Sequence, residues 1–191
     1  MGTDKALLPW PPSESPSSSG ESFISAAIHS LEQATDFVLV VAGKNESSLA
    51  PIVCSRGASL VTNPDPSRGQ FSSLQIGLRE VLNRGRDGAI ITLVDRPPAL
   101  QETVQSLRAT FEAAAQNIWA VVPEFSGKHG HPYVVGREMI ECFLQAAEGE
   151  TAREIEHRNQ SHIQYVAVSD PCVAQNINTP EDYAALKAKS L

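Results

Sequence analysis

The sequence is poor in several features that mark particular classes of protein. It has only three cysteines, Cys54, Cys142 and Cys172, with no CxxC pair that would indicate zinc or redox chemistry. We therefore expect three ordinary, buried or half-buried thiols. No stretch approaches the ~20 apolar residues of a membrane span, and the first residues lack the pattern of a signal peptide. We expect a soluble, cytoplasmic protein with no membrane partner.

Basic residues are also scarce relative to acidic ones. The 191 residues include 15 Lys and Arg against 22 Asp and Glu, which gives a net charge of -7. Such a surface does not neutralise many phosphates, so nucleic acid is excluded as the expected partner. Any nucleotide that binds is expected to be a small molecule. The length fits one domain spanning residues 1–191.

Short apolar runs rich in branched residues alternate with stretches of helical period. This pattern is typical of an α/β fold in which helices cover both faces of a parallel sheet. The predicted strands are 37–42, 59–62, 89–94, 118–122 and 163–168. The predicted helices are 22–34, 71–82, 100–114, 137–147, 152–158 and 180–189.

Two stretches fit no regular element. The segment PPSESPSSSG at 11–20 has too few apolar groups to offset the entropy of ordering it, so it predicts a mobile loop. The segment 123–136, rich in glycine and histidine, predicts a loop that leads into a short strand near the site. His129 and His131 lack a third ligand at suitable spacing, which argues against a transition-metal site.

Asp95 is the first candidate functional residue. It follows an apolar run and precedes Arg96 and two prolines, so it should lie at the carboxyl edge of the sheet. Open α/β folds bind their ligands at that edge. The structural alternative is that Asp95 caps the helix starting near Ala99, although the prolines place it several residues early.

The segment NINTPEDY at 176–183 predicts a helix start. Thr179 is suited to the N-cap, Pro180 to the first helical position, and acidic residues follow in the first turn. Asn176 and Asn178 can present amide oxygens just before this helix.

The start of the predicted helix at 71–82 is suited to anions or polar base edges, because helix starts carry free N–H groups. Its structural alternative is Ser72 as a plain N-cap. Lys5, considered alone, reads as a solvated charge.

Together these segments resemble the MobA-like nucleotidyltransferases over nearly the whole chain. The similar stretches are MGTDKALLPW at 1–10, NPDPSRGQFSSLQIGL at 63–78, LVDRP at 93–97, GHP at 130–132 and NINTPEDY at 176–183. The LLPW stretch is the main reason that the chain looks most like the molybdenum cofactor cytidylyltransferases. The resemblance implies a three-layer α/β/α Rossmann-like nucleotidyltransferase fold with a mostly parallel sheet.

The resemblance also implies roles for individual residues. Asp95 would be a ligand of Mg²⁺, with Asn178 as the second ligand and Asn176 as the fallback. Lys5 and Asp95 would be the catalytic residues, with the lysine on the nucleotide phosphates. The implied nucleotide-binding residues are Gly2, Lys5, Asn63, Gly69, Ser73 and Asp95. The implied acceptor-binding residues are Gly130, His131, Pro132 and Arg153.

The implied reaction moves a nucleoside monophosphate from CTP to a phosphorylated acceptor, molybdopterin, with release of pyrophosphate. The protein would orient the groups and neutralise charge, without a nucleophilic side chain. GTP transfer to molybdopterin is the nearest alternative, and a non-catalytic nucleotide-binding module is an alternative of another class. Sugar phosphates, methylerythritol phosphate and phospholactate also stay open as acceptors.

In the resembling family, an interior first strand and a LAAGxSxR loop precede the residues matched by Met1 and Gly2. We expect a natural product that begins further upstream. Without that segment, we expect an exposed gap in the sheet that another chain could fill, and weak or absent catalysis.

Overall fold

The structure is a computed structural model that describes residues 4–12 and 20–189, with side chains through Leu186. Gly2 and most of the predicted mobile loop at 11–20 lie outside the described residues. The described flanks of that loop meet in an antiparallel bridge between Pro9 and Ser22. The N–H of Trp10 donates to the carbonyl of Glu21 at 3.0 Å. The two described flanks of the segment therefore lie side by side.

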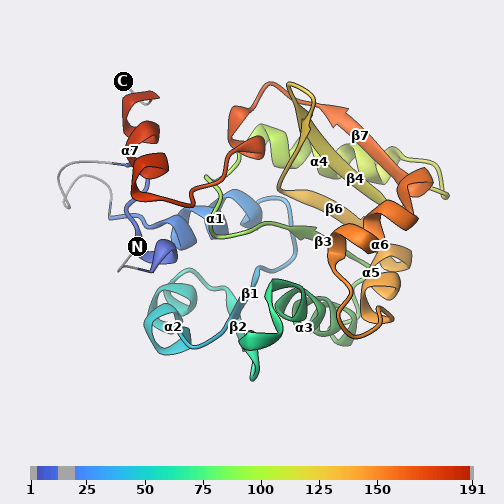
Figure 1. The fold of residues 1–191 in the computed structure, drawn as a ribbon, viewed down its shortest axis with the longest axis horizontal. Helices are drawn as coiled ribbons and strands as arrows, with labels where there is room; N and C mark the ends of the chain where they lie inside the picture. Colours follow the sequence, from blue (N-terminus) through green and yellow to red (C-terminus); the bar gives the residue numbers. More distant parts are fainter. Residues whose placement is uncertain (1–3, 13–19, 190–191) are drawn as a thin grey trace.

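The expected α/β class is confirmed (Figure 1). One sheet has two parallel strands, β1 (Leu39–Ala42) and β2 (Ser59–Thr62). The other has five strands, with the order β3-β6-β4-β5 and with β7 paired to β4. These strands are β3 (Gly88–Ile91), β4 (Ala120–Phe125), β5 (Lys128–His129), β6 (Tyr133–Gly136) and β7 (Ile163–Ala167).

The sheet is more mixed than the predicted strands suggested. β4 and β7 are parallel, whereas β6 runs antiparallel to β3 and β4, and β5 runs antiparallel to β4. The reason lies in the segment 123–136, which was expected to be a loop leading into a strand. It extends β4 to Phe125 and then turns back as β5 before β6 begins.

The helices form two layers around the strands (Figure 1). Alternate side chains of β1 face opposite layers: Val40 packs in the cluster of α1 and α2, and Val41 faces Gly77 of α3. Strands that are apolar on both faces need such cover. One layer holds α1 (Phe23–Glu32), α2 (Glu46–Ser55) and α4 (Gln101–Ala113). The other holds α3 (Gln70–Asn83), α5 (Arg137–Leu144) and α6 (Ala152–Arg158).

The last helix, α7 (Pro180–Lys189), lies to one side, next to the amino-terminal segment (Figure 1). It is held there by a small cluster in which Phe23, Ile177 and Leu186 are buried. Tyr183 completes the link, since its hydroxyl donates to the carbonyl of Pro9 at 2.8 Å.

Two sequence expectations need correction. The helix α2 was not predicted; it contains Pro51, which is unfavourable inside a helix, yet the buried Leu49 and Val53 anchor it to the core. The three thiols are not all buried or half-buried, because Cys54 is exposed on this helix while Cys142 and Cys172 are half-buried. The other predicted helices are present with shifts of a few residues at their ends.

Candidate active site

Asp95 lies in a turn shortly after β3, at the carboxyl end of that strand, where the Arg96 N–H donates to the Leu93 carbonyl at 3.2 Å. Its side chain is half-buried, and its Oδ1 atom is buried without a hydrogen-bond partner among the described residues. A buried carboxylate oxygen is costly unless something satisfies it. The Asp95 carboxylate therefore has free capacity for a cation or a donor.

The alternative role of Asp95 as a helix cap is wrong. Asp170, from a distant part of the chain, takes that role for α4. Its Oδ2 accepts hydrogen bonds from the Leu100 N–H at 2.8 Å and the Thr103 hydroxyl at 3.1 Å. Its Oδ1 accepts from the Cys172 N–H at 2.9 Å, and the residue is only 1% exposed. Asp170 is a structural carboxylate with every oxygen engaged.

The segment that carries the two asparagines runs beside Asp95. The N–H of Ile177 donates to the Asp95 carbonyl at 2.8 Å, and the Ile177 side chain is 2% exposed. The flanking Asn176 and Asn178 are exposed. The structure thus brings the backbone of both predicted metal-ligand segments together, although they are far apart in sequence.

The predicted start of α7 is confirmed. The Asp182 N–H donates to the Thr179 hydroxyl at 3.1 Å, and Asp182 Oδ2 accepts from the N–H groups of Thr179 and Asn178, each at 2.9 Å. This reciprocal pattern is a capping box. The hydrogen bonds from the Thr179 and Asn178 backbone, with a smaller contribution from the charge of Lys5, lower the pKa of Asp182.

Lys5 is therefore close enough to the start of α7 for its charge to act there. It is half-buried in a short 3-10 helix, Lys5–Leu7, which Asp4 caps by accepting from the Ala6 N–H at 3.0 Å. The other Asp4 oxygen accepts from the Asn45 side chain at 2.7 Å. This contact fixes the amino-terminal segment to the carboxyl end of β1.

Asn63, a predicted nucleotide-binding residue, is 3% exposed and bonded within the protein. Its Nδ2 donates to the hydroxyls of Ser72 and Ser73, each at 2.9 Å, and its Oδ1 accepts from the Asp65 N–H at 3.0 Å. These bonds hold the turn after β2 against the start of α3. Ser73 is thereby positioned by Asn63.

The reading of Ser72 as an N-cap is wrong. The helix begins two residues earlier, at Gln70, and Gly69 occupies the cap position with a φ of 88°. A positive φ of this size favours glycine. The Ser72 hydroxyl instead donates back to the Gly69 carbonyl at 2.7 Å.

The GHP segment packs against residues 171–174. A Cβ added to Gly130 would lie 1.9 Å from the Val173 carbonyl oxygen, so only glycine fits there. The His131 N–H donates to that oxygen at 3.0 Å, and His131 joins Pro132 through a cis peptide. Gly130 therefore sets the close approach that positions His131.

Arg96 and His131 share this contact. Arg96 Nη1 donates to the same Val173 oxygen at 3.2 Å. Both Arg96 Nε and His131 Nδ1 are buried without a hydrogen-bond partner among the described residues. Burial, and then the Arg96 charge, lowers the pKa of His131 to about 3, so this imidazole is neutral at neutral pH. Burial also lowers the pKa of Arg96.

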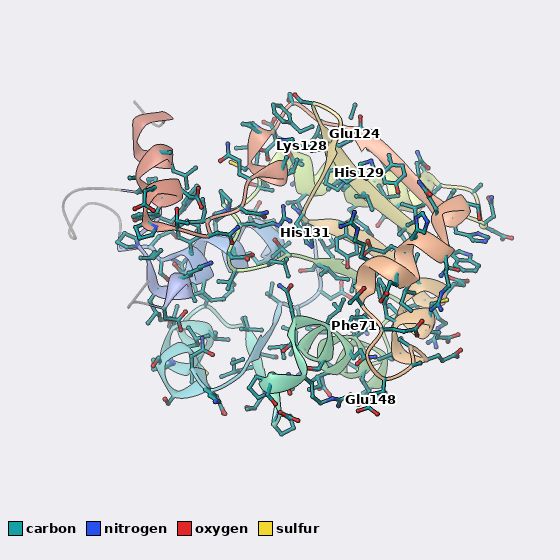
Figure 2. The ribbon with its side chains drawn as sticks, viewed as in Figure 1. Phe71, Glu124, Lys128, His129, His131 and Glu148 are labelled. Carbon is teal, nitrogen blue, oxygen red and sulfur yellow. The ribbon has the colours of Figure 1, made fainter. Side chains whose placement is uncertain are left out.

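The two histidines have different surroundings. In Figure 2, His131 lies near the centre of the molecule, above the helix that carries Phe71, whereas His129 lies out towards Glu124. The His129 ring stacks on Tyr165 at 3.9 Å, and its Nε2 is 3.3 Å from a Glu124 oxygen. Within the described residues, no group of three or more His, Cys, Asp or Glu could hold a metal ion. The site predicted from the sequence combines the Asp95 carboxylate with an asparagine amide oxygen, so it contains only one residue of these four types.

The comparison of the chain with family models decides its family. The model of the MobA-like NTP transferase domain matches residues 1–163. The chain belongs to the MobA-like NTP transferase domain family. No curated protein matches its sequence. Within the described part of this transferase domain, no helix has both the length and the apolar character needed to cross a membrane.

Solved structures share the fold of this MobA-like domain. Rv0371c from Mycobacterium tuberculosis H37Rv matches with a TM-score of 0.77 and 22% identity, over 97% of this chain and 90% of that chain. Its complex with manganese matches with 0.74 and 21%, over 95% and 90%. A CMP:2-keto-3-deoxy-manno-octonic acid synthetase complexed with CTP matches with 0.69 and 13%, over 98% and 92%.

A cavity of about 1600 Å³ opens inside the transferase domain. Four of the predicted site residues line it: Gly69, Ser73, His131 and Arg153. Arg153 is exposed on α6. Asp95 is not in the lining, but its neighbours Val94 and Arg96 are. The cavity therefore joins the start of α3 to the loop that carries the candidate carboxylate.

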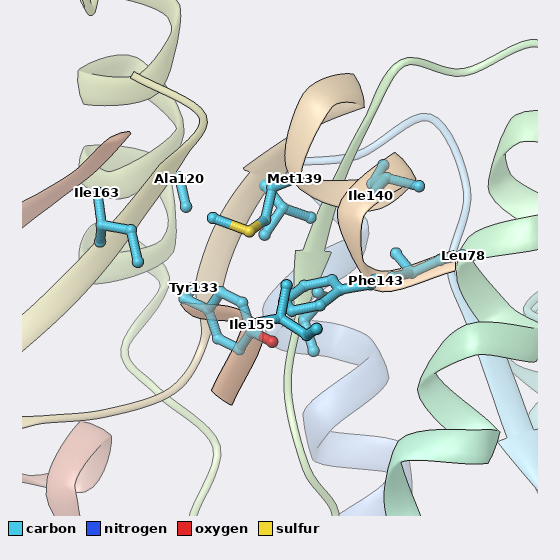
Figure 3. Close-up of a cluster of buried hydrophobic side chains, with 10 residues drawn as sticks. Leu78, Ala120, Tyr133, Met139, Ile140, Phe143, Ile155 and Ile163 are labelled. Atoms are coloured by element: carbon cyan, nitrogen blue, oxygen red, sulfur yellow. The ribbon is translucent and has the colours of Figure 1, made fainter. Parts of the chain in front are cut away.

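Sequence reasoning missed three residues of this site. Arg96 could have been noticed, because it stands inside the DRP motif beside Asp95. Tyr133 and Glu156 gave no local signal, since they come from β6 and α6 and meet only in the fold. The Tyr133 ring lies beside Ile155 in the buried cluster of Figure 3. Burial raises the pKa of Tyr133, with a further contribution from the neighbouring Glu156, and burial also raises the pKa of Glu156.

Proposed function

We propose that this protein is a nucleotidyltransferase that moves a nucleoside monophosphate from CTP to a phosphorylated acceptor. The observation that carries the proposal is the Asp95 carboxylate beside the Asn176–Asn178 segment, with one buried oxygen that has no partner in the part of the chain that the structure describes. Membership of the family supplies the reaction class. We treat residues 1–191 as a single domain of this kind.

The chemistry is an in-line substitution at phosphorus. A phosphate oxygen of the acceptor forms a bond to the α-phosphorus of CTP, while the bond to the bridging oxygen breaks and pyrophosphate leaves. The protein contributes orientation and charge, and no covalent intermediate with a side chain is required. Lys5, with its ammonium near the start of α7, would balance phosphate charge.

We assign a divalent cation, Mg²⁺, to Asp95 and Asn178, with Asn176 as the fallback ligand. The fit rests on the orphaned Asp95 oxygen and on the amide oxygens of an adjacent exposed segment. Hard cations prefer such oxygen ligands and accept few from the protein. When bound, the cation would neutralise charge on the phosphates. The manganese complex of Rv0371c supports a divalent ion in this fold.

CTP and a molybdopterin acceptor are the finer parts of the proposal. CTP is supported by the LLPW stretch and by the CTP complex of a protein with the same fold. For the nucleotide we assign Gly2, Lys5, Gly69, Ser73 and Asp95, with Asn63 acting through the hydrogen bond by which it positions Ser73. For the acceptor we assign Gly130, His131, Pro132 and Arg153. We add Arg96, because its buried Nε has no acceptor among residues 4–12 and 20–189 and its N–H is suited to an anion.

The test combines binding with turnover. Thermal unfolding is followed with CTP or GTP, each with Mg²⁺, Mn²⁺ or a chelator, because a ligand that binds the native state raises the melting temperature. Pyrophosphate release is measured with molybdopterin and with sugar phosphates. We expect stabilisation that needs both nucleotide and cation, and release that is greatest with CTP and molybdopterin.

Each other outcome removes a definite part of the proposal. Release that is greatest with GTP would make the protein a guanylyltransferase. Cation-dependent binding without release, for every acceptor, would make it a non-catalytic nucleotide-binding module. No binding of any nucleotide would overturn the proposal.

A further inference from the structure

Lys5, to which we assign the nucleotide phosphates, is held in the fold by contacts on both sides of it along the chain. Before it, Asp4 accepts from the Asn45 side chain at 2.7 Å, which ties the segment to the carboxyl end of β1. After it, the Leu8 carbonyl accepts from the Phe23 N–H at 2.9 Å, at the start of α1. The position of Lys5 is therefore set by what its neighbours contact.

A small cluster of apolar side chains holds the segment that follows Lys5. It joins this segment to the start of α1 and to the stretch that leads into and forms α7. We call it the aromatic cluster, and its members are Leu8, Trp10, Phe23, Ile177, Tyr183 and Leu186. The ring centroids of Trp10 and Phe23 are 5.1 Å apart in an edge-to-face contact, and those of Phe23 and Tyr183 are 6.0 Å apart.

The aromatic cluster is also connected to the candidate metal site. The Ile177 side chain is buried in the cluster, while its N–H donates to the Asp95 carbonyl at 2.8 Å. Ile177 lies between the exposed Asn176 and Asn178, which are the candidate amide ligands. The cluster therefore has the Lys5 segment on one side and the proposed cation ligands on the other.

Tyr183 makes a direct link from α7 to the amino-terminal segment. Its hydroxyl donates to the Pro9 carbonyl at 2.8 Å, shortly after Lys5 in the chain. Burial raises the pKa of Tyr183, so the hydroxyl keeps the proton that this bond needs. The pKa of the adjacent Asp182 is lowered by backbone hydrogen bonds and, to a smaller extent, by the charge of Lys5. The first turn of α7 therefore lies near the amino-terminal segment at two places.

The ring and the hydroxyl of Tyr183 contribute differently. The ring packs in the aromatic cluster, as a phenylalanine ring would. The hydroxyl adds a directional bond to a backbone carbonyl, which fixes how far α7 lies from the segment that carries Lys5. Such precision matters at a reaction centre, because a misplacement of about 1 Å can cost about a hundredfold in rate.

We propose that Tyr183 is a positioning residue of the transferase reaction, whose hydroxyl fixes Lys5 relative to the cation ligands on the Asn176–Asn178 segment. This inference rests on the proposed function, because it concerns how Lys5 meets the nucleotide phosphates. Tyr183 contacts neither nucleotide nor cation in this role and acts through Lys5. Negative charge on the phosphoryl oxygens grows in the transition state, so a displaced ammonium should lower kcat more than it raises the KM for CTP.

The test begins with Tyr183→Phe, which removes the hydroxyl and keeps the ring. We expect kcat for pyrophosphate release with CTP, Mg²⁺ and molybdopterin to fall about tenfold, with less than about a twofold change in the KM for CTP. The matched control is Tyr165→Phe, which should leave both constants unchanged. Tyr165 stacks on His129 and belongs to β7, which lies on the opposite side of the molecule from α7 (Figure 1).

A double-substitution cycle with Lys5→Ala separates positioning from a general loss of stability. If the hydroxyl acts through Lys5, its removal should have no further effect once Lys5 has been replaced. We therefore expect Tyr183→Phe to lower kcat about tenfold in the parent chain and less than about twofold in the Lys5→Ala chain. A fold that is merely loosened would lose the same factor in both chains.

The remaining outcomes distinguish this inference from the proposed function. A parent chain that releases no pyrophosphate with any nucleotide and acceptor would overturn the proposed function, and this inference with it. An active parent whose kcat is unchanged by Tyr183→Phe would overturn the inference alone. Equal factors in the parent and Lys5→Ala chains would overturn it as well, because Tyr183 would then only stabilise the docking of α7.

Discussion

The Asn63 turn and the Asp95 loop both follow strands, but their polar side chains are in opposite states. Asn63 has three hydrogen bonds to its own protein, which fix the start of α3. The Asp95 loop instead brings together buried atoms of Asp95, Arg96 and His131 that lack partners among the described residues. The first region is complete without a ligand, whereas the second has donors and acceptors that a ligand would satisfy.

The largest expected effect is on ligand binding at the Asp95 loop. We expect Asp95→Asn to weaken cation-dependent nucleotide binding by about a hundredfold, because a neutral amide replaces the charged ligand. The melting temperature without ligand should stay within about 2 °C of the parent, since no protein partner is lost. Thermal unfolding at several CTP and Mg²⁺ concentrations measures both. A folding defect with unchanged affinity would make Asp95 a structural residue.

The matched substitution in the Asn63 turn should mainly lower the stability of the fold. We expect Asn63→Ala to lower the free energy of unfolding by about 2 kcal/mol, because it leaves buried groups unpaired. Urea unfolding measures the loss. The control is Asn178→Ala, an exposed side chain whose removal should cost less than about 0.5 kcal/mol. Equal losses in the two variants would contradict the comparison.

A third substitution distinguishes binding of the acceptor from binding of the nucleotide. We expect Arg96→Gln to raise the KM for the phosphorylated acceptor about tenfold and to leave the affinity for CTP unchanged, because the charge facing an anionic group is lost. Steady-state pyrophosphate release measures the KM. Arg96→Lys should recover part of the loss. An equal effect on CTP would move Arg96 to the nucleotide side.

The smallest expected effect is a pH dependence. Because the pKa of folded His131 is about 3 and that of an unfolded histidine is about 6.5, the unfolded chain binds the extra proton first. Stability is therefore lost as the pH falls below about 6.5. From pH 7 to 5.5, the parent should lose about 1 kcal/mol more than His131→Gln in urea unfolding. Parallel losses would show that His131 gains access to water.

The sequence predicted local features well where short-range chemistry decides them. The start of α7 follows from residues close together in the chain: Pro180 is its first residue, and Thr179 and Asp182 hydrogen-bond each other across the first turn. The helix α2 could not be predicted in the same way, because Pro51 opposes it locally and only packing of Leu49 and Val53 outweighs that cost. The sequence likewise predicted only those parts of the candidate site that depend on neighbouring residues.

Within the site, Asp95 could be placed at the strand end from its own neighbours, but its surroundings could not. The sequence allowed Asp95 to cap α4, but Asp170 takes that role. Asp170 bonds Leu100 at the start of α4 although the two residues are 70 positions apart. Tyr133 and Glu156 meet across two elements with no shared motif. Pairings of this kind depend on topology rather than on spacing.

By itself, the sequence determined which stretches are apolar on two faces, where helices can begin, and which family the chain resembles, because these depend on residue types and short spacings. The tertiary structure decided which polar atoms are satisfied and which are open. It also decided that residues of β1 and β3, which lie far apart in the sequence, line the same cavity. Those outcomes depend on which distant segments meet, because burial makes an unpaired atom costly only after the chain has packed around it.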